Sequence, residues 1–424
     1  MPRVSPVRAV ASNGGELLTG VYHTYMLNNG EINGLRTWIE IDKKALKHNY
    51  NLLRRIIPKK CLLMSVVKSN AYGHSLLDFS KEVEKLGADF LSVDSIIEAR
   101  ALRKEGIKIP ILVLGYTMPE LFKEATEKNI SLTISNFEAL NALKKVSEKK
   151  ELKKSLKIHI KVDTGMSRQG FLADSLPKIL GELKVKSGKH APLFPPGRYT
   201  SGLKVQVEGL YTHFAAAKNP SFPKYTYEQM EQFKKWTDAF KKSGFKPIVH
   251  AAASSGTLIF PESHFDMVRV GIALYGLWPS PEVEAFCREK FPLKPILTWK
   301  TIIGEIKIIK AGSKIGYDLT ETLDKDTKIA ICPIGYWHGF PRALSSISNV
   351  LVKGQKCRVL GKVSMDMIAI DVTKVKSLRI RENVIILGRQ GGQEITAKDM
   401  ANLSDTVNYE IITRINPLVK RFYI

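Results

Sequence analysis

Short apolar runs alternate with amphipathic segments along the chain from residue 61 to residue 276. Runs rich in β-branched and apolar residues are typical of parallel strands buried on both faces, and the segments between them have helical spacing. The predicted strands are, in order, Cys61–Lys68, Asp89–Ser95, Pro110–Gly115, Ile130–Ser135, Lys157–Asp163, Val207–Phe214, Ile248–Ser254 and Met267–Gly276.

Eight such strands separated by helices indicate a parallel sheet closed into a (β/α)8 barrel, the TIM barrel. The longest predicted helix of this region covers Tyr227–Lys242. A doubly wound open sheet is the alternative, but the GxGxxG loop typical of dinucleotide-binding sheets does not follow the first strand. The pattern therefore favours the barrel.

The pattern changes after residue 285. Strand-like runs with Gly and Asp turns follow one another, and helical spacing returns only near the C-terminus. This predicts a second, mostly β domain over residues 286–424. The barrel would span residues 37–285, behind an N-terminal extension of residues 1–36. Thr37–Asp42 also reads as a strand, and it is a candidate to pair with the β domain instead of the barrel.

One irregular stretch, Ser187–Lys204, interrupts the barrel between its fifth helix and its sixth strand. Connections of this kind lie at the bottom of such barrels, opposite the catalytic loops. We therefore interpret it as a surface insertion in preference to a partner-binding loop.

Composition narrows the function classes. No apolar run approaches the roughly 18 residues of a membrane span, and residues 1–36 contain no stretch resembling a secretory signal. A cytoplasmic protein without membrane contact is therefore expected. Cys61, Cys287, Cys332 and Cys357 are far apart, and no histidine pattern of a metal site occurs. We expect neither a disulfide framework nor a metal.

The formal net charge of +24 raises the question of nucleic-acid binding. The lysines, however, are spread in short groups over helix-like segments, such as Lys144-Lys145 and Lys153-Lys154, without interleaved aromatic residues. A stacking platform for nucleic acid needs such aromatics. We interpret the charge as solvated helix faces and expect no nucleic-acid partner.

Active sites of (β/α)8 barrels form at the carboxyl ends of the strands. The residues suited to chemistry there are Lys68 after the first strand, Arg168 after the fifth, His213 on the sixth, Ser254 after the seventh and Arg269 on the eighth. Each alone has an ordinary structural explanation, but together they surround one rim. We expect the active site at that rim.

The first and last strands indicate what this rim binds. Apolar neighbours of Lys68 can lower its pKa by desolvation and favour the neutral amine that forms a Schiff base. Gly271 and Ile272 follow the eighth strand, where backbone N–H groups can bind an anion because glycine permits close approach. Phosphate sites of barrels commonly use the loops after strands seven and eight, where Ser254 also lies.

The motifs that carry these residues resemble those of the alanine racemases, which combine a barrel with a β domain and use pyridoxal 5'-phosphate. The resemblance extends from Thr37 to Tyr423 and rests on VVKSNAYGHS, KVDTGMSRQGF, THFA, DMVRVGIALYG, KIGYDLTET, VSMDM and TVNYE. It implies a racemase that interconverts L- and D-alanine and supplies D-alanine for peptidoglycan.

The resemblance also implies roles for individual residues. Lys68 would carry the cofactor as a Schiff base and serve as base for the D-face, with Tyr317 as base for the L-face. Arg168 and the backbone N–H of Met365 would bind the substrate, and Lys161 occupies a position that can be carbamylated. The cofactor-binding residues would be Lys68, Tyr72, His213, Ser254, Arg269, Gly271, Ile272 and Tyr409.

By the same resemblance, Arg269 contacts the pyridine nitrogen and keeps it unprotonated, while His213 packs against the ring and hydrogen-bonds Tyr317. Tyr317 and Met365 would enter the site from the partner subunit of a homodimer. As a base, Tyr317 would have to lose its proton about three pH units below its ordinary pKa of about 10. Arg168 and His213 can favour this loss by charge and hydrogen bonding.

Three positions depart from the family's usual pattern. Ala253 stands where asparagine is usual, Asp318 follows Tyr317 where glycine is usual, and Ser364 replaces a frequent cysteine. Ala253 removes one polar contact near the cofactor. We expect Asp318 to restrict its loop or to place a negative charge beside the base.

Other functions stay open at this point. A broader racemase acting on serine or lysine would use the same residues. A decarboxylase or aldolase with this cofactor leaves Arg269 and the Tyr317 motif unexplained, and a pyridoxal-phosphate carrier leaves the β domain unexplained. Alanine racemisation is therefore the working hypothesis.

Overall fold

The computed structural model describes residues 34–148, 152, 154–183 and 204–424. Most of the expected N-terminal extension, and all of the insertion Ser187–Lys204 except its last residue, lie outside the described residues. Within the described ranges, no helix is both long enough and apolar enough to cross a membrane.

Eight parallel strands close into a barrel in this part of the chain, since the first strand pairs with both the second and the last. These strands are β2 (Leu62–Val66), β3 (Phe90–Val93), β4 (Ile111–Val113), β5 (Ile130–Ile134), β6 (Leu156–Lys161), β7 (Val205–Tyr211), β8 (Ile248–His250) and β9 (Met267–Val270). The predicted TIM barrel is confirmed, with its strands in the predicted order.

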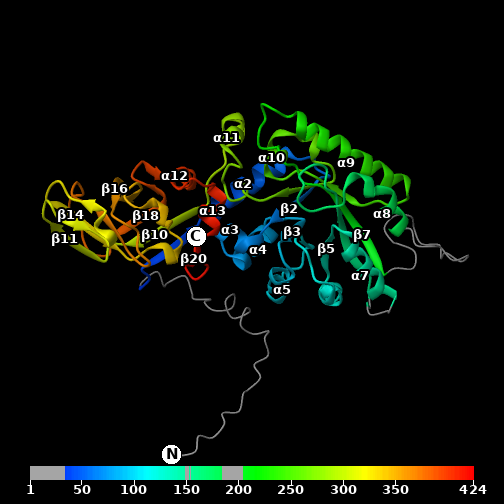
Figure 1. Cartoon of the computed structure of the whole chain (residues 1–424), viewed down its shortest axis with the longest axis horizontal. Helices are drawn as coiled ribbons and strands as arrows, with labels where there is room; N and C mark the ends of the chain where they lie inside the picture. The colour runs from blue at the N-terminus through cyan, green and yellow to red at the C-terminus, as the bar shows by residue number, and fades with distance from the viewer. Residues whose placement is uncertain (1–33, 149–151, 153, 184–203) are drawn as a thin grey trace, which may run out of the picture. The chain divides into compact units, whose positions relative to one another are not determined.

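Helices cover the outside of the barrel, as Figure 1 shows for α4, α5, α7 and α9. The helices up to the end of the barrel region are α2 (Lys43–Ile56), α3 (Lys68–Gly73), α4 (Leu76–Lys85), α5 (Ile96–Lys104), α6 (Phe122–Glu127), α7 (Phe137–Glu148), α8 (Leu176–Leu183), α9 (Lys224–Lys242), α10 (Ser254–Ile259) and α11 (Pro281–Cys287). Their apolar stripes pack on strands that are apolar on both faces, which explains why the strands read as continuous hydrophobic runs.

Several strands end earlier than the sequence pattern predicts. β9 stops at Val270, and residues 271–276 form turns although their side chains stay buried. β7 stops at Tyr211, so His213 lies two residues beyond its strand and not on it. Apolar residues in a buried loop look like a continuing strand, because periodicity reports burial and not backbone conformation.

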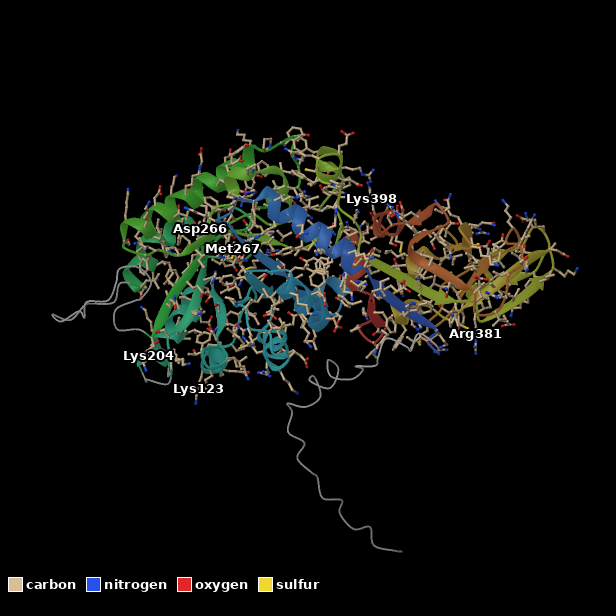
Figure 2. The ribbon with its side chains drawn as sticks, turned by 180° about the vertical axis from the view of Figure 1, so that it is seen from behind. Lys123, Lys204, Asp266, Met267, Arg381 and Lys398 are labelled. Atoms are coloured by element: carbon tan, nitrogen blue, oxygen red, sulfur yellow. The ribbon has the colours of Figure 1, made fainter. Side chains whose placement is uncertain are left out.

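Four strands of the barrel each contribute one residue to a buried apolar cluster, formed by Met64, Phe90, Leu112 and Met267. Met267 begins β9, and Asp266 directly before it accepts a hydrogen bond from Val249 N at 2.9 Å (Figure 2). The polar contact thus fixes the start of β9 against β8, while the apolar cluster fixes its buried face.

The remaining strands form one large mixed sheet and a small two-stranded one. They are β1 (Thr37–Ile41), β10 (Leu297–Ile302), β11 (Glu305–Ile309), β12 (Lys314–Ile315), β13 (Glu321–Thr322), β14 (Thr327–Cys332), β15 (Asn349–Val352), β16 (Gln355–Leu360), β17 (Ile368–Asp371), β18 (Asn383–Gln390), β19 (Gln393–Ile395) and β20 (Lys420–Tyr423), with helices α12 (Ala397–Leu403) and α13 (Asn408–Thr413). β1 lies between β10 and β20 in this sheet. The first described strand therefore belongs to the same sheet as the last.

One ion pair connects α12 with the end of the barrel region. Lys398, labelled in Figure 2, lies 2.7 Å from Glu284 on α11. Glu284 also binds Arg288 one turn further along the same helix. The carboxylate is mostly buried, so these two cations supply the partners that a buried charge needs.

Candidate active site

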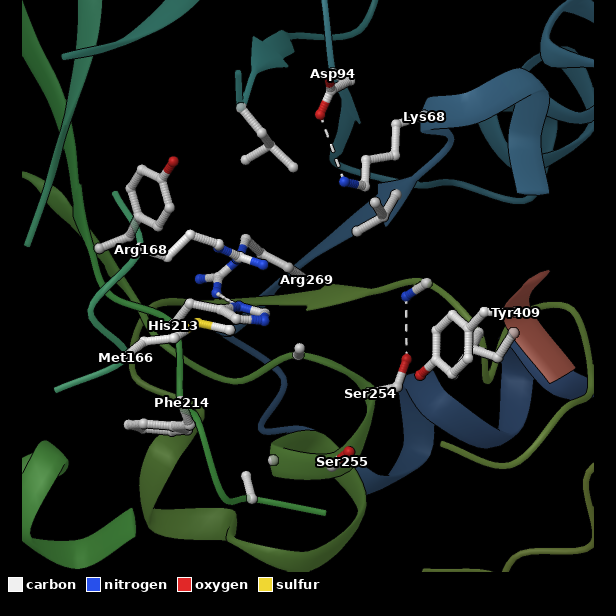
Figure 3. A pocket seen from close by; sticks show the side chains of 18 of the residues that line it. Lys68, Asp94, Met166, Arg168, His213, Phe214, Ser254, Ser255, Arg269 and Tyr409 are labelled. Carbon is white, nitrogen blue, oxygen red and sulfur yellow. Dashed lines mark hydrogen bonds and ion pairs between the residues drawn. The ribbon is translucent and has the colours of Figure 1, made fainter. Parts of the chain in front are cut away.

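The carboxyl ends of the barrel strands surround a cavity of about 730 Å³. Ten of the residues singled out in the sequence line it, namely Lys68, Tyr72, Lys161, Arg168, His213, Ser254, Arg269, Gly271, Ile272 and Tyr409. Arg168, His213 and Arg269 lie together on one side, with Ser254 and Tyr409 on the other (Figure 3). Tyr317 and Met365 are not among the described residues that line it.

Lys68 opens a turn with a rare backbone conformation. The next four residues, Ser69–Tyr72, have φ between 50° and 57°, a left-handed region that costs an ordinary residue on the order of 1 kcal/mol or more. Glu98 offsets this cost, because its Oε1 accepts hydrogen bonds from Ser69 N at 2.7 Å and from Asn70 N at 3.4 Å. A carboxylate from α5 thus holds the lysine-bearing turn in place.

The same turn is held from the other side by residues near the C-terminus. Gly73 has φ 84°, and a Cβ there would lie 2.0 Å from Ile412 O on α13. Arg421 Nε donates to Gly73 O at 3.0 Å, and Tyr423 donates to His74 O at 2.7 Å. Only glycine fits this close approach, which docks β20 and α13 against the turn.

The Lys68 amine lines the cavity and stays partly exposed. Its Nζ is 3.4 Å from Asp94 Oδ1, and 38% of the side chain is exposed (Figure 3). The expectation that apolar neighbours desolvate this lysine does not hold for the described chain. The lysine leaves the strand at the start of the turn, so its side chain reaches a carboxylate and solvent.

Hydroxyl groups gather on the side of the cavity that faces Arg168, His213 and Arg269. The Tyr72 hydroxyl is so close to Gly271 that a Cβ on that glycine would lie 2.5 Å from it. Burial raises the pKa of Tyr72 to about 12 and also raises the pKa of Tyr409. Both phenols therefore stay protonated at neutral pH and can donate hydrogen bonds.

Ser254 begins α10 beside these phenols. Its Oγ accepts hydrogen bonds from Gly271 N at 3.1 Å and Ala273 N at 3.3 Å, which leaves its own proton to donate elsewhere. The Gly271 N–H thus has a partner that the sequence did not indicate. At Ala253, the N-cap of α10, no side chain caps the helix, so the asparagine-to-alanine departure removes a polar group at this point.

Arg269 is the most deeply buried cation of the site. Its Nη2 shares two protons among Thr212 O at 2.8 Å, Ala251 O at 2.9 Å and His213 Nδ1 at 3.1 Å, and its Nη1 donates to His250 Nδ1 at 3.0 Å. Burial lowers the pKa of Arg269 to about 10. The group is still a cation at neutral pH, and its position is set by four acceptors.

This arrangement fixes the protonation of His213. An arginine can only donate, so His213 Nδ1 must accept and the ring proton must sit on Nε2. Burial, together with the charges of Arg269 and Arg168, holds the pKa of His213 well below its ordinary value. The imidazole is therefore neutral at physiological pH and offers one N–H donor at the cavity.

The loop that carries Arg168 is shaped by Asp163. The two carboxylate oxygens accept hydrogen bonds from the backbone N–H groups of Gly165, Met166, Ser167 and Arg168, at 2.8 to 3.1 Å. Partial burial acts to raise the pKa of Asp163, but these bonds lower it overall. An ionised carboxylate thus holds the loop that places the Arg168 side chain at the cavity.

Lys161 lies beside this loop, at the end of β6. Its Nζ donates to Gln169 Oε1 at 2.9 Å. Burial, followed by the charges of Arg168 and Arg269, lowers its pKa to about 8. A substantial fraction of this amine is therefore neutral near physiological pH, as reaction with carbon dioxide would require.

Tyr317 and Met365 lie on the β region instead. Tyr317 begins a short 3-10 helix, η4 (Tyr317–Leu319), and is 68% exposed, and Met365 is 53% exposed. Both side chains are thus available to another molecule. Four other large apolar side chains of this region are also exposed: Leu319, Tyr336, Trp337 and Met367.

Asp318 adopts φ 57°, a conformation in which glycine is less strained. Its carboxylate binds the Lys362 ammonium, which lowers the pKa of Asp318. The expected restriction of the loop is therefore present, whereas the negative charge beside Tyr317 is paired. Lys362 lies three residues before Met365, so this ion pair joins the two segments that carry Tyr317 and Met365.

Comparison with known proteins supports the same interpretation. Residues 41–279 match the family model described as alanine racemase, N-terminal domain, and residues 296–423 match alanine racemase, C-terminal domain. The chain belongs to the alanine racemase family. Both matched regions contain residues named above, including Lys68 in the first and Tyr317 in the second.

Individual members of the family are similar over nearly the whole chain. The alanine racemase of Symbiobacterium thermophilum is 39% identical over 398 residues, covering 93% of this chain and 98% of that protein. The alanine racemase of Clostridium difficile 630 has a TM-score of 0.82 at 31% identity, covering 92% of this chain and 96% of that one. The Bacillus anthracis alanine racemase with bound L-Ala-P has a TM-score of 0.81 at 34% identity, covering 92% and 95%.

Two residues that line the cavity, Asp94 and Lys218, and one that binds a lining residue, Glu98, were not found from the sequence. Asp94 pairs with Lys68, and Glu98 holds the turn after it. Lys218 lies with its Nζ 4.8 Å from the centre of the Tyr409 ring. The spacing Ser95-x-x-Glu98 signals a helix cap, which the structure contains, but nothing local indicates that the same carboxylate also binds the turn after β2.

The pKa of Lys161 predicts a pH-dependent stability. Below about pH 8 the folded chain carries the full cost of burying this charge. Between about 8 and 10.5 the unfolded chain binds more protons here, so the free energy of unfolding rises with pH. Lys161→Met removes this contribution to the pH dependence. The free energy of unfolding of the variant, relative to that of the unmodified protein, should therefore fall between about pH 8 and 10.5. Urea unfolding in carbonate-free buffer measures this, with the exposed Lys224→Met as control. A stability difference that does not change with pH would contradict the assignment.

Proposed function

We propose that this chain interconverts L- and D-alanine with pyridoxal 5'-phosphate bound to Lys68. The observation that carries the proposal is the arrangement of the cavity, in which a reachable lysine amine and three hydroxyl donors stand around the same space as a buried arginine. The bound cofactor supplies an electron-withdrawing ring that acidifies the α-proton of an amino acid. The protein's own residues orient that ring and move the proton.

The described residues fit this cofactor. Tyr72, Ser254 and Tyr409 are donors for a phosphate, with the backbone of Gly271 and Ile272 beside them. The space that a Cβ on Gly271 would fill is taken up by the Tyr72 hydroxyl, so the glycine is needed for this donor to reach its place. Lys68 would form the Schiff base.

Arg269 would contact the pyridine nitrogen and His213 would pack against the ring. An arginine of pKa about 10 does not readily give up its proton at neutral pH, so the ring nitrogen opposite it would stay unprotonated. Limited withdrawal of electrons into the ring then favours return of the proton to the α-carbon over transamination.

Arg168 would bind the carboxylate of the substrate. Its loop is held by Asp163, so the guanidinium approaches the cavity from a fixed backbone. We further propose that Lys161 is carbamylated, since its amine is partly neutral and lies near enough to Arg168 and Arg269 for their charges to lower its pKa. A carbamate there would pair with Arg168.

We propose that the active unit is a homodimer in which Tyr317 and the Met365 backbone N–H of one subunit complete the cavity of the other. The exposure of Tyr317, Met365 and the apolar side chains named with them supports this. They lie on connected backbone, because Trp337 N donates to Met365 O at 3.0 Å. The neutral His213 Nε2–H would donate to the Tyr317 oxygen and stabilise its deprotonated form.

Two other assignments are kept as predictions. We propose that the chain divides into a barrel of residues 37–285 and a β domain of residues 286–424, with Thr37–Asp42 in the sheet of the latter. We also propose that the enzyme acts in the cytoplasm, which agrees with the absence of a membrane-spanning helix among the described residues.

Purified protein loaded with pyridoxal phosphate is expected to convert either enantiomer of alanine into the racemic mixture. Chiral chromatography of the products measures this. Serine and lysine, offered at the same concentration, test for a broader racemase. Absence of turnover in both directions, with the cofactor bound as its absorption band shows, would exclude alanine as substrate.

Tyr317→Phe tests the base for the L-face. Exchange of the α-proton of L-alanine with solvent deuterium is expected to fall by roughly 10² to 10⁴, the usual contribution of a general base. Exchange from D-alanine, which depends on Lys68, should persist. Tyr227→Phe, at an exposed tyrosine on α9, is the matched control. An equal loss on both faces, or loss of the cofactor band, would show that Tyr317 has a structural role.

Mixing two inactive variants tests the shared site. In a mixed dimer of Lys68→Ala and Tyr317→Phe subunits, one of the two cavities contains both Lys68 and Tyr317. After subunit exchange at equal concentration, activity should return to about one quarter of the unmodified level, because half of the dimers are mixed and each has one intact site. No recovery, despite exchange shown by mass-tagged subunits, would mean that each chain completes its own site.

A further inference from the structure

A chain of buried polar side chains runs from Arg269 away from the cavity into the barrel. Arg269 Nη1 lies 3.0 Å from His250 Nδ1, and His250 Nε2 lies 2.9 Å from His159 Nδ1. His159 Nε2 in turn lies 3.2 Å from Glu208 Oε2. His250 and His159 have no solvent exposure, and Glu208 is 5% exposed. None of the proposed catalytic or binding roles uses these last three residues.

The direction of every hydrogen bond in this chain follows from its first member. Arginine has donors only, so His250 Nδ1 accepts and the His250 proton is on Nε2. His250 Nε2–H then donates to His159 Nδ1, which places the His159 proton on Nε2, where it donates to Glu208. The geometry thus specifies the tautomers of both histidines, with Glu208 as the terminal acceptor.

Glu208 is an ionised group at the end of this chain. Burial acts to raise its pKa, but the hydrogen bonds from His159 and the Ser131 hydroxyl, and the charge of Lys157, lower it overall. Ser131 Oγ donates to the same oxygen that His159 contacts, and Lys157 Nζ lies 3.5 Å from the other. A full negative charge is therefore held inside the barrel.

The backbone of the strands leaves room for these hydrogen-bonded side chains. The His159 ring occupies the space beside Gly209 on β7, where a Cβ would lie 2.0 Å from His159 Nδ1. The pairing of β6 with β7 shifts register at His159, as a bulge would cause. The Tyr211 ring stacks on His250 with centroids 4.7 Å apart and planes 8° apart. Both imidazoles are thus held in single orientations.

Arg269 needs this charge because its own partners are all neutral. The guanidinium contacts two carbonyls and two imidazoles, and no carboxylate among the described residues forms an ion pair with it. A buried cation without a counter-charge is costly. The nearest negative charge along its hydrogen bonds is that of Glu208, two imidazoles away.

We propose that Glu208, acting through His159 and His250, is a positioning residue that holds Arg269 and limits how strongly its guanidinium donates to the group in the cavity. Hydrogen bonds in a series polarise one another. The negative charge of Glu208 therefore makes His250 a more electron-rich acceptor for one N–H group of Arg269. The guanidinium then becomes a weaker hydrogen-bond donor to the group in the cavity. The consequence for catalysis rests on the proposed function, in which Arg269 faces the pyridine nitrogen. The direction of the hydrogen bonds does not depend on it.

Nitrogen-15 spectra of protein labelled at histidine test the direction of the hydrogen bonds. Both His159 and His250 should carry their ring proton on Nε2 and none on Nδ1, in apoprotein and holoenzyme alike. In Glu208→Gln the His159 Nε2–H resonance should shift, because the acceptor loses its charge. Glu284→Gln changes another mostly buried carboxylate, which is not part of this series of hydrogen bonds. This control should leave the His159 Nε2–H resonance unchanged. A proton on Nδ1 of either ring, or a charged His159, would overturn the proposal.

The ratio of two reactions tests the effect on Arg269. In holoenzyme with alanine, slow conversion to pyruvate, as the cofactor takes up the amino group, competes with racemisation. Glu208→Gln should raise the ratio of pyruvate formation to racemisation on the order of tenfold. Removal of a carboxylate that hydrogen-bonds a metal-ligating histidine has an effect of similar size in other proteins. Glu284→Gln should leave the ratio unchanged. An unchanged ratio would reduce Glu208 to a structural role and overturn the proposal.

The two measurements separate this proposal from the proposed function. If the unmodified protein does not racemise alanine, the proposed function fails, and the nitrogen-15 spectra still decide whether the hydrogen-bonded chain exists. If Glu208→Gln does not fold, the tautomers in the unmodified protein decide the same point, because the proposal allows only one assignment for each ring.

Discussion

The buried guanidinium of Arg269 is the interaction on which the rest of the site depends. A cation without solvent exposure is tolerated only where hydrogen bonds replace its hydration, and here they go to Thr212 O, Ala251 O, His213 and His250. The two carbonyls follow β7 and β8, and β8 meets β9 through the single pair His250–Met267. Arg269 therefore links three strands where the sheet itself has few hydrogen bonds. Because the guanidinium can only donate, it also sets the protonation of both histidines that it contacts.

The two ends of the cavity around this cation carry different kinds of side chain. One end offers neutral hydroxyl groups, which suit a phosphate, and the other end gathers Arg168, Lys161 and Arg269. Between them, Lys68 is placed by a turn whose strained backbone is held by Glu98 and by the C-terminal strand. The barrel and the large sheet thus contribute to the same lysine within one chain, while Tyr317 stands exposed elsewhere. That combination is the basis for our proposal that Tyr317 of a second subunit completes the cavity.

The sequence predicts the barrel well, since eight buried strands leave eight apolar runs that helices separate. It also predicts most cavity residues, because the carboxyl ends of parallel strands meet at one rim and the motifs there resemble a known family. It does not predict where the strands stop, as the buried turn after Val270 is as apolar as β9. Nor does it indicate Glu98 at the Lys68 turn or Glu208 behind Arg269, since these contacts join residues from different strands and helices. The exposure of Lys68 was missed because flanking apolar residues say nothing of the direction in which a side chain leaves its strand.

The proposed chemistry depends on Arg269 as a fixed cation that would face an unprotonated ring nitrogen. The most direct measurement is the nitrogen-15 chemical shift of holoenzyme loaded with pyridoxal phosphate labelled at the pyridine nitrogen. We expect the shift of an unprotonated, hydrogen-bonded nitrogen that stays constant over the neutral pH range. The shift of a protonated pyridinium at neutral pH would contradict it, because an arginine held by four acceptors cannot share its proton with the ring.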